Sequence, residues 1–184
     1  INQQSPFIQK AASVTNIMLM VILALVPGLI FYVYFFGVGV LLNVFVASLT
    51  ALIAEYFVLK MRKLPPKVYL SDGSALVAAW LLALSIPSIA PWWIIVVGTL
   101  FTIVIAKHFY GGLGSNIFNP AMIGYAVLLI SFPAIMTKWP SPIENSLSME
   151  SIRQALQVFF YGLTQVGDGL TSATPLDYIK TELL

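Results

Sequence analysis

The apolar positions of this chain gather into long runs separated by short polar connections. Five runs predict membrane helices: Asn16 to Phe36, Val40 to Leu59, Ala75 to Ile86, Trp92 to Ala106, and Ala121 to about Thr137. At 1.5 Å per residue, about 20 apolar residues cross a hydrocarbon core of about 30 Å, as the first two runs do. The third run is shorter, and a kinked extension through Ile89 would let it span. The pattern predicts an all-α integral membrane protein with about five transmembrane helices.

The apolar pattern weakens from Lys138 onward, where Pro, Ser, Asn, Glu and Arg become frequent. One amphipathic helix is still predicted there, from Ser148 to Phe160. We therefore expect two parts: a transmembrane helical domain over residues 1–137 and a loop region over residues 138–184.

Two of the apolar runs are short and interrupted. "SDGSALVAAWLLALSIP" and "NPAMIGYAVLLISFP" both begin with polar helix-start residues and are both cut by a proline. In the second, Asn119 is placed as an N-cap and Pro120 as the first helical residue. Paired interrupted helices can offer their backbone ends to a cofactor, substrate or ion near mid-membrane. A pair of Pro-kinked spans explains the same pattern.

Basic residues mark one side of this arrangement. Lys10 precedes the first run, Lys107 follows the fourth, and the second and third are separated by Lys60, Arg62, Lys63 and Lys67. The connections at residues 37–39 and 87–91 contain none. Because positive loops stay inside, the N-terminus is expected in the cytoplasm. Five crossings then place everything after Lys138 on the outer, periplasmic face.

Composition supports a membrane location and narrows the chemistry. The chain is 59% hydrophobic and 9% charged, against roughly 45–50% and 25% in a soluble domain. Its net charge of +2 is too small to predict a nucleic-acid partner, so membrane lipid is the expected surroundings. With no cysteine and one histidine, it cannot hold an iron–sulfur cluster through thiolates or haem through two histidines. Any redox cofactor must be organic, and we predict no metal site and no catalytic residue.

A few polar residues are candidates for a site of another kind. Glu55 lies near a membrane boundary, where a carboxylate can belong to an ion path. Lys60 lies five positions on, and either pairing with Glu55 or snorkelling is expected. Asp72 is expected to cap a helix. His108 is expected at the membrane interface or beside a helix C-terminus rather than as a base. The glycines at 111, 112 and 114 follow an apolar helix rather than a strand, which favours a cytoplasmic turn over a phosphate-binding loop.

Several motifs occur together in the order and spacing of a known family. "APWW", "YGGLG" and "FNPAMIGY" lie between Ser74 and Pro133, and "ATPLD" covers residues 173–177. Over nearly the whole chain, the sequence resembles the D subunits of Rnf complexes, the ion-translocating electron-transport complexes of bacterial inner membranes. It is more distantly similar to the B subunits of sodium-pumping NADH:quinone oxidoreductases. The resemblance implies the first half of an inverted-repeat fold, with the A, B, C, E and G subunits of the Rnf complex as partners.

The same resemblance implies a covalent flavin. Family members carry FMN joined through its phosphate to a threonine, installed by a flavin transferase that reads D-x-x-(S/T)-(small or polar)-A-(T/S). In this chain the recognition positions and the acceptor are Asp168, Thr171, Ser172, Ala173 and Thr174. Thr174 would be the acceptor. A second, non-covalent flavin such as riboflavin, and the choice between sodium and proton, stay open.

Local chemistry agrees with Thr174 as an acceptor. Pro175 biases Thr174 toward extended backbone, which keeps its hydroxyl accessible to a modifying enzyme. The leading interpretation is an electron-carrying subunit of an ion pump that has no substrate turnover of its own. The alternative is a channel or secondary-transporter half with broken helices and no flavin, in which residues 168–174 are only a turn. A membrane anchor without redox function is a third.

Overall fold

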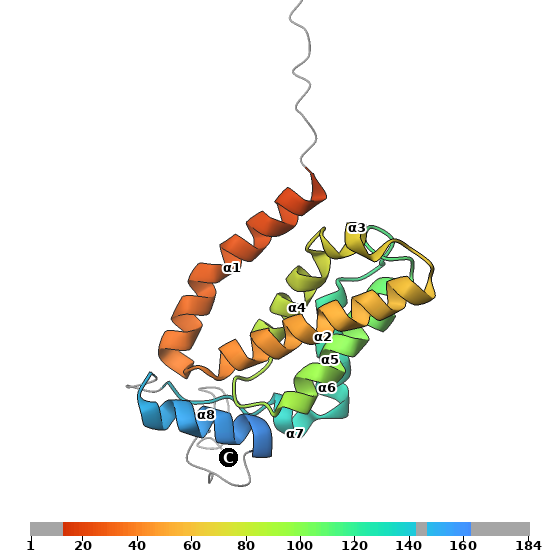
Figure 1. The fold of residues 1–184 in the computed structure, drawn as a ribbon. Coiled ribbons are helices and arrows are strands. Elements are labelled where there is room, and N and C mark those ends of the chain that lie inside the picture. Colours follow the sequence, from red (N-terminus) through yellow and green to blue (C-terminus); the bar gives the residue numbers. More distant parts are fainter. Residues whose placement is uncertain (1–12, 143–146, 163–184) are drawn as a thin grey trace, which may run out of the picture.

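The computed structural model describes residues 13–142 and 147–162 (Figure 1). Every element within these ranges is a helix: α1 Val14–Phe36, α2 Gly39–Met61, α3 Pro66–Leu70, α4 Ser74–Ser85, α5 Trp92–Leu100, the π-helix η1 Phe101–His108, α6 Pro120–Ser131, α7 Pro133–Met136 and α8 Met149–Tyr161. The predicted all-helical fold is confirmed for these residues. The flavin motif from Asp168 to Thr174 lies outside them.

Helices α1 and α2 are both long and apolar enough to cross a membrane, at 23 residues each. α1 ends where Gly37 adopts a φ of 81° and donates its N–H to the Val33 carbonyl at 2.9 Å. Leu29 is its one buried residue in the described structure, so most of its apolar side chains face outward. α2 lies in the centre of the bundle and contacts α1, α4, α5 and η1. Small residues such as Ala47 and Ala51 let these neighbours approach it closely.

Helix α4 matches the short run predicted before Pro87 and does not continue beyond it. It ends at Ser85, Ile86 is extended with φ −98° and ψ 142°, and the chain turns through Ser88 and Ile89. The expected helical extension through Ile89 is therefore wrong. Pro87 is the reason, because a proline disfavours helical backbone in the residue before it. The Asn43 side chain of α2 donates to the Pro87 carbonyl at 3.2 Å and fixes this turn against the start of α2.

The fourth apolar run forms one continuous helix, Trp92–His108, whose second half is η1. At its end, the Phe109 N–H donates to the Val104 carbonyl at 3.1 Å, which is the i→i−5 spacing of a π-helix. η1 and α6 lie in close contact around Gly124. A Cβ atom at position 124 would overlap the Thr102 hydroxyl and come within 2.8 Å of the Gly98 carbonyl oxygen. Only glycine permits this approach.

The predicted start of α6 is confirmed. The Asn119 side chain accepts a hydrogen bond from the Ala121 N–H at 3.0 Å, and Pro120 is the first helical residue. The predicted interruption is also confirmed, since α6 ends at Ser131 and Pro133 begins the separate short helix α7. The two interrupted helices, α4 and α6, have 12 residues each and contact one another.

The amphipathic helix predicted after the apolar runs is confirmed as α8. Ser148 caps it by accepting from the Ser151 N–H at 3.1 Å. Val158 and Phe159 are buried, while Phe160 and Tyr161 are exposed. Figure 1 shows α8 lying across the end of the bundle where α1 ends and α2 begins, and α8 contacts α2 there.

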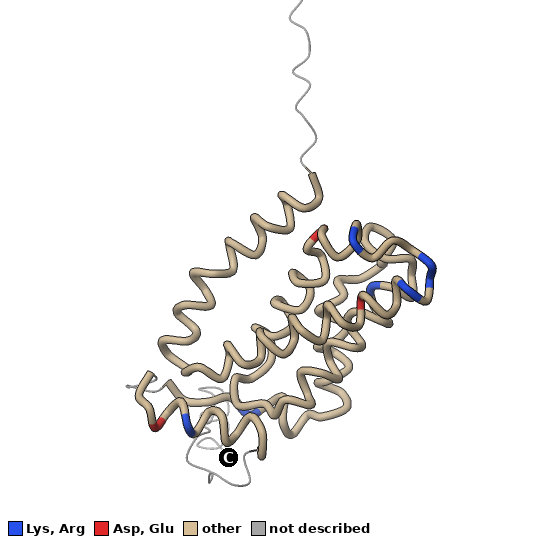
Figure 2. Tube along the Cα trace, viewed as in Figure 1, with Lys and Arg blue, Asp and Glu red and all other residues tan. Residues whose placement is uncertain are grey.

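The longer helices run alternately between two ends of the bundle. One end, here called the basic end, contains the C-terminus of α2, the short helix α3 and the start of α4. Figure 2 shows Lys and Arg concentrated there. The helix bounds place five basic residues at the ends of α2 and η1, in the turn between α2 and α3, and in α3: Lys60, Arg62, Lys63, Lys67 and Lys107. The opposite end contains α7 and α8, with Lys138 and Arg153. The expected gathering of basic residues on one side thus appears in the fold.

Candidate functional site

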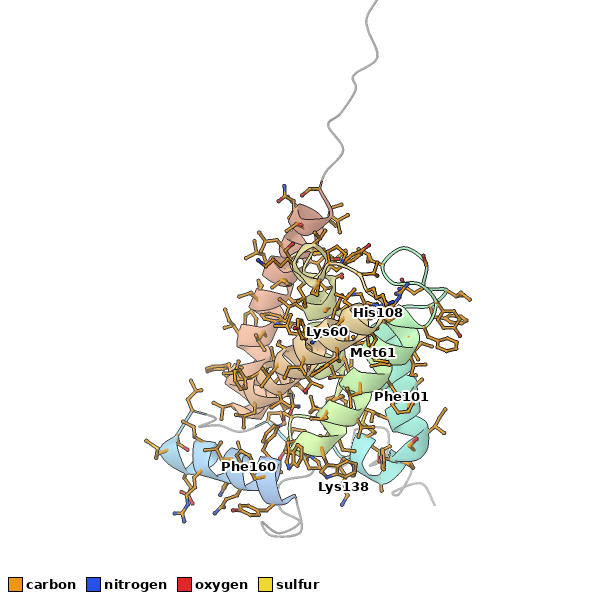
Figure 3. All side chains as sticks on the ribbon, turned by 45° about the vertical axis from the view of Figure 1, so that its right-hand side comes forward. Lys60, Met61, Phe101, His108, Lys138 and Phe160 are labelled. Atoms are coloured by element: carbon orange, nitrogen blue, oxygen red, sulfur yellow. The ribbon has the colours of Figure 1, made fainter. Side chains whose placement is uncertain are left out.

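Polar side chains from three helices meet inside the basic end. Glu55 comes from α2, Lys107 and His108 from the end of η1, and Ser74 from the first position of α4. All four are buried, with Glu55 1% and Lys107 3% exposed. Figure 3 shows His108 at this end of the bundle, close to the end of α2 marked by Lys60 and Met61. We call these four residues the charge cluster.

Glu55 and Lys107 form the centre of the charge cluster. Lys107 Nζ lies 2.6 Å from Glu55 Oε1 and 2.7 Å from Oε2, and it donates to Ser74 Oγ at 2.7 Å. These three acceptors match the three hydrogens of the ammonium group. Burying a charge is costly unless it is paired and hydrogen-bonded, and both conditions are met here.

The expected pairing of Glu55 with Lys60 is wrong. Lys60 is exposed, and the partner of Glu55 is Lys107, 52 residues away in the sequence. Helix geometry explains the failure, because residues five apart are separated by about 140° around an α-helix and do not share a face. Glu55 points into the bundle, whereas Lys60 points away from it.

His108 is the last residue of η1, which confirms the expected position beside a helix C-terminus. His108 is buried, with Nε2 3.5 Å from Glu55 Oε1 and Nδ1 3.4 Å from Arg62 Nη1. Arg62 Nη1 also donates to the Gly111 carbonyl at 3.2 Å, so its side chain covers the histidine. The sequence does contain one sign of this arrangement, because a carboxylate within an apolar run requires a charged partner. Such a partner can come from a distant part of the chain and be buried beside it.

Asp72 has the predicted capping role, and it places a second carboxylate next to the charge cluster. Its Oδ1 accepts from the Ser74 N–H at 2.7 Å and from the Ser74 hydroxyl at 2.6 Å. The capping position itself is Gly73, with a φ of 77°, so Asp72 acts from one residue earlier. Asp72, Ser74, Lys107 and Glu55 thus form one hydrogen-bonded chain that connects α4, η1 and α2. Nothing in the sequence pattern indicates this connection.

A cavity of about 190 Å³ adjoins the charge cluster. Its apolar walls include Met18, Val77, Leu81 and Leu113, and its polar groups are Ser74, Lys107, Asn116 and Asn119. The Asn116 Oδ1 atom is buried and has no hydrogen-bond partner among the described residues. Ser74 and Pro120 are the first residues of α4 and α6, so the two interrupted helices both begin beside this cavity. Their starts meet at the basic end rather than near the middle of the bundle.

The glycines between η1 and α6 form a turn, as predicted. Gly111, Gly112 and Gly114 have φ values of 120°, 103° and 85°, which side chains with a Cβ rarely adopt. The turn follows a helix and brings Leu113 to the cavity. The predicted flavin-site residues, Asp168, Thr171, Ser172, Ala173 and Thr174, lie beyond the described part of the chain.

The described helices, two of them long and apolar enough to cross a membrane, are consistent with an α-helical membrane protein. The family described as "NQR2, RnfD, RnfE family" matches residues 1–183, and the chain belongs to this family. Similar proteins, named as D subunits of the ion-translocating oxidoreductase complex, occur in Yersinia pseudotuberculosis, with 52% identity, and in Escherichia coli, with 48%. Each alignment covers 97% of this chain and 54% of the relative. The chain therefore spans about half the length of the curated relatives it matches, and the resemblance to Rnf D subunits is confirmed.

Proposed function

We propose that the chain is the first half of a membrane subunit of an ion-translocating electron-transport complex and that it carries electrons through FMN bound covalently to Thr174. The relatives are named as subunits of an ion-translocating oxidoreductase complex. The heptapeptide from Asp168 to Thr174 is the observation that carries the flavin assignment, since each of its specified positions fits the flavin-transferase pattern. When bound, FMN supplies one- and two-electron chemistry and so links one-electron centres to two-electron carriers.

Each motif residue has a part in this proposal. The Thr174 hydroxyl forms the phosphoester with FMN. Asp168, Thr171, Ser172 and Ala173 are the positions read by the transferase during maturation. Covalent attachment suits a loop in contact with water, because a cofactor that exchanged freely would be lost to bulk solvent.

The arrangement of the helices supports a periplasmic position for the flavin. If the basic end faces the cytoplasm, as the positive-inside bias favours, then α8 lies toward the periplasm. We propose that α1, α2, α4, the α5–η1 helix and α6 are the five crossings in the bacterial inner membrane. The division into residues 1–137 and 138–184 then separates a membrane domain from a periplasmic region that bears the flavin.

The flavin proposal is tested by co-expressing the chain with an active flavin transferase. After denaturation, the parent chain is expected to show flavin fluorescence on a gel, and Thr174→Val is expected to show none. Thr181→Val, outside the motif, is the matched control and should fluoresce like the parent. Fluorescence that survives in Thr174→Val, or is absent from the parent despite active transferase, would contradict the proposal.

The cavity beside Lys107 is our proposed place for a second, non-covalent flavin such as riboflavin. Its apolar walls suit an isoalloxazine ring, and the unpartnered Asn116 amide oxygen suits an N–H donor on the ring edge. Riboflavin fluorescence is expected to be quenched on binding to the parent chain and less so with Asn116→Ala. Asn16→Ala, at the exposed start of α1, is the control. Equal binding by both variants would remove Asn116 from the site.

The alternative function is a channel or secondary-transporter half without flavin. Its support is the meeting of the two interrupted helices beside one cavity, an arrangement found at ion and substrate sites. This alternative predicts no flavin on the parent chain in the gel experiment. The two functions are therefore separated by one measurement. In either case the partners are other membrane subunits and lipid, with the flavin transferase required only for the first.

A further inference from the structure

The basic end carries an outward surface that the charge cluster does not use. The turn from Lys60 to Lys67 leaves Lys60, Lys63 and Lys67 exposed, and none of the three forms an ion pair with another described residue. The two carboxylates at this end are already occupied: Glu55 by Lys107 and Asp72 by Ser74. Positive charge therefore remains uncompensated on the outside. We call residues 60–67 the basic turn.

The backbone of the basic turn holds Lys63 in an unusual conformation. α2 ends in a Schellman motif, in which the Leu64 N–H donates to the Leu59 carbonyl at 3.0 Å and the Lys63 N–H to the Lys60 carbonyl at 3.1 Å. Lys63 occupies the left-handed position of this motif, with a φ of 56°. Among the described residues it is the one non-glycine residue with a positive φ. Glycine is the preferred residue at this position, so a lysine here carries strain that the fold does not require.

Exposed apolar side chains surround these lysines. Met61 is 83% and Val68 64% exposed in the basic turn and α3, and Phe109 is 77% exposed just after η1. The hydrogen bond from Arg62 to the Gly111 carbonyl holds the basic turn beside the segment that follows η1. Figure 3 shows Lys60, Met61 and His108 together at this end, far from Lys138 and Phe160. Lysines among exposed apolar and aromatic residues at the ends of membrane helices are typical of a surface at headgroup level.

We propose that the basic turn, with the neighbouring apolar side chains, is a binding surface for the phosphate groups of anionic lipids such as phosphatidylglycerol. The lysine ammonium groups lie against the headgroup phosphates, and Met61, Val68 and Phe109 enter the boundary between headgroups and acyl chains. Charge complementarity favours an anionic lipid, and the exposed apolar side chains favour a lipid over free phosphate. This inference is independent of the flavin on Thr174.

The test measures lipid binding by the full 184-residue chain, purified in a neutral detergent. Phosphatidylglycerol or phosphatidylcholine is added, and native mass spectrometry measures the lipid retained. The parent chain should retain phosphatidylglycerol in preference to phosphatidylcholine, with a preference that weakens as salt is raised. A triple variant, Lys60→Gln with Lys63→Gln and Lys67→Gln, should lose about fivefold in phosphatidylglycerol affinity for each lysine removed. The double variant Lys138→Gln with Arg153→Gln, at the opposite end, is the matched control and should retain the preference.

A second variant separates lipid binding from folding. Lys63→Gly relieves the positive φ, so its melting temperature should equal or exceed that of the parent, while its phosphatidylglycerol affinity falls about fivefold. The proposal is overturned if the parent shows no preference for the anionic lipid, or if the triple variant keeps the parent's preference. It is also overturned if inorganic phosphate at the same concentration displaces the lipid, because the ligand would then be free phosphate.

Discussion

At the scale of single residues, the pairing of Glu55 with Lys107 determines how the basic end can be packed. Three hydrogen bonds from one ammonium group join α2, η1 and α4 through atoms 2.6–2.7 Å apart. Removing one partner of a buried pair leaves an uncompensated charge, which costs more than the pair itself contributes. The two side chains therefore stabilise the fold as a unit.

Glu55→Gln is expected to destabilise the chain by about 3–5 kcal/mol, because Lys107 would keep its charge without a carboxylate. The measurement is thermal unfolding of the purified chain in detergent. Lys60→Gln, which removes an exposed lysine, should change stability by less than about 0.5 kcal/mol. Glu55→Gln combined with Lys107→Met should be less damaging than Glu55→Gln alone, since neither charge is then stranded. A large loss in Lys60→Gln would contradict the observed pairing.

At this scale, the sequence predicted the partner of a polar residue only where the two residues lie close together along the chain. The roles of Asn119, Pro120 and Asp72 were predictable because capping involves residues within three positions of one another. The partner of Glu55 was not predictable in this way, because the packing of α2 against η1 brings Lys107 to it. The burial of His108 was not predictable for the same reason, since its neighbours Glu55 and Arg62 lie in α2 and at its C-terminus.

At the scale of helices, close contact of the continuous α5–η1 helix with α6 depends on two glycines, Gly98 in α5 and Gly124 in α6. At Gly98, an added Cβ would lie 2.5 Å from a methyl carbon of Leu128. At Gly124, an added Cβ would meet the Thr102 hydroxyl and the Gly98 carbonyl. Small residues at such crossings let helix backbones approach closely and gain van der Waals contact, the main attraction between helices in lipid.

Gly124→Ala is expected to destabilise the chain by about 1–3 kcal/mol, because the added methyl group would force η1 and α6 apart. Gly28→Ala is the matched control. Gly28 is also a helical glycine, but an added Cβ there meets nothing within 4 Å, so the change should be neutral or stabilising by up to about 1 kcal/mol. Thermal unfolding in detergent compares the two. Equal losses of stability in Gly124→Ala and Gly28→Ala would contradict the close packing of η1 against α6.

Helix boundaries were predictable from the sequence to the extent that proline and glycine set them. Pro133 divides α6 from α7 and Pro87 ends α4, both as expected. The π-helix η1 was not foreseen. No proline or glycine lies within Phe101–His108 to signal it, and its hydrogen-bond pattern accompanies close packing against α6.

At the scale of the whole molecule, the distribution of basic residues and the direction of the helices favour the same orientation in a membrane. Basic residues gather at one end of the bundle, and α7 and α8 lie at the other (Figures 1 and 2). A membrane oriented by the positive-inside bias would place the basic turn in the cytoplasm and α8 in the periplasm. The same orientation is required for a periplasmic flavin, so topology can be tested separately from the cofactor.

The chain contains no cysteine, so single cysteines can report topology without background. Lys67→Cys lies in the exposed helix α3 of the basic end, and Leu147→Cys lies at an exposed position just before α8. In intact spheroplasts, a maleimide that cannot cross the membrane should label Leu147→Cys and spare Lys67→Cys until the cells are permeabilised. The reverse pattern would place the flavin motif in the cytoplasm and contradict the proposed topology.

Whether Thr174 carries the flavin can be decided by tandem mass spectrometry of a single peptide. Trypsin cleaves after Arg153 and Lys180, so residues 154–180 form one peptide that contains the whole motif and the competing hydroxyls of Thr164, Thr171 and Ser172. From the chain matured with an active flavin transferase, we expect this peptide to gain the mass of FMN less one water, with fragments assigning it to Thr174. An unmodified peptide, or FMN on any other residue, would overturn the assignment.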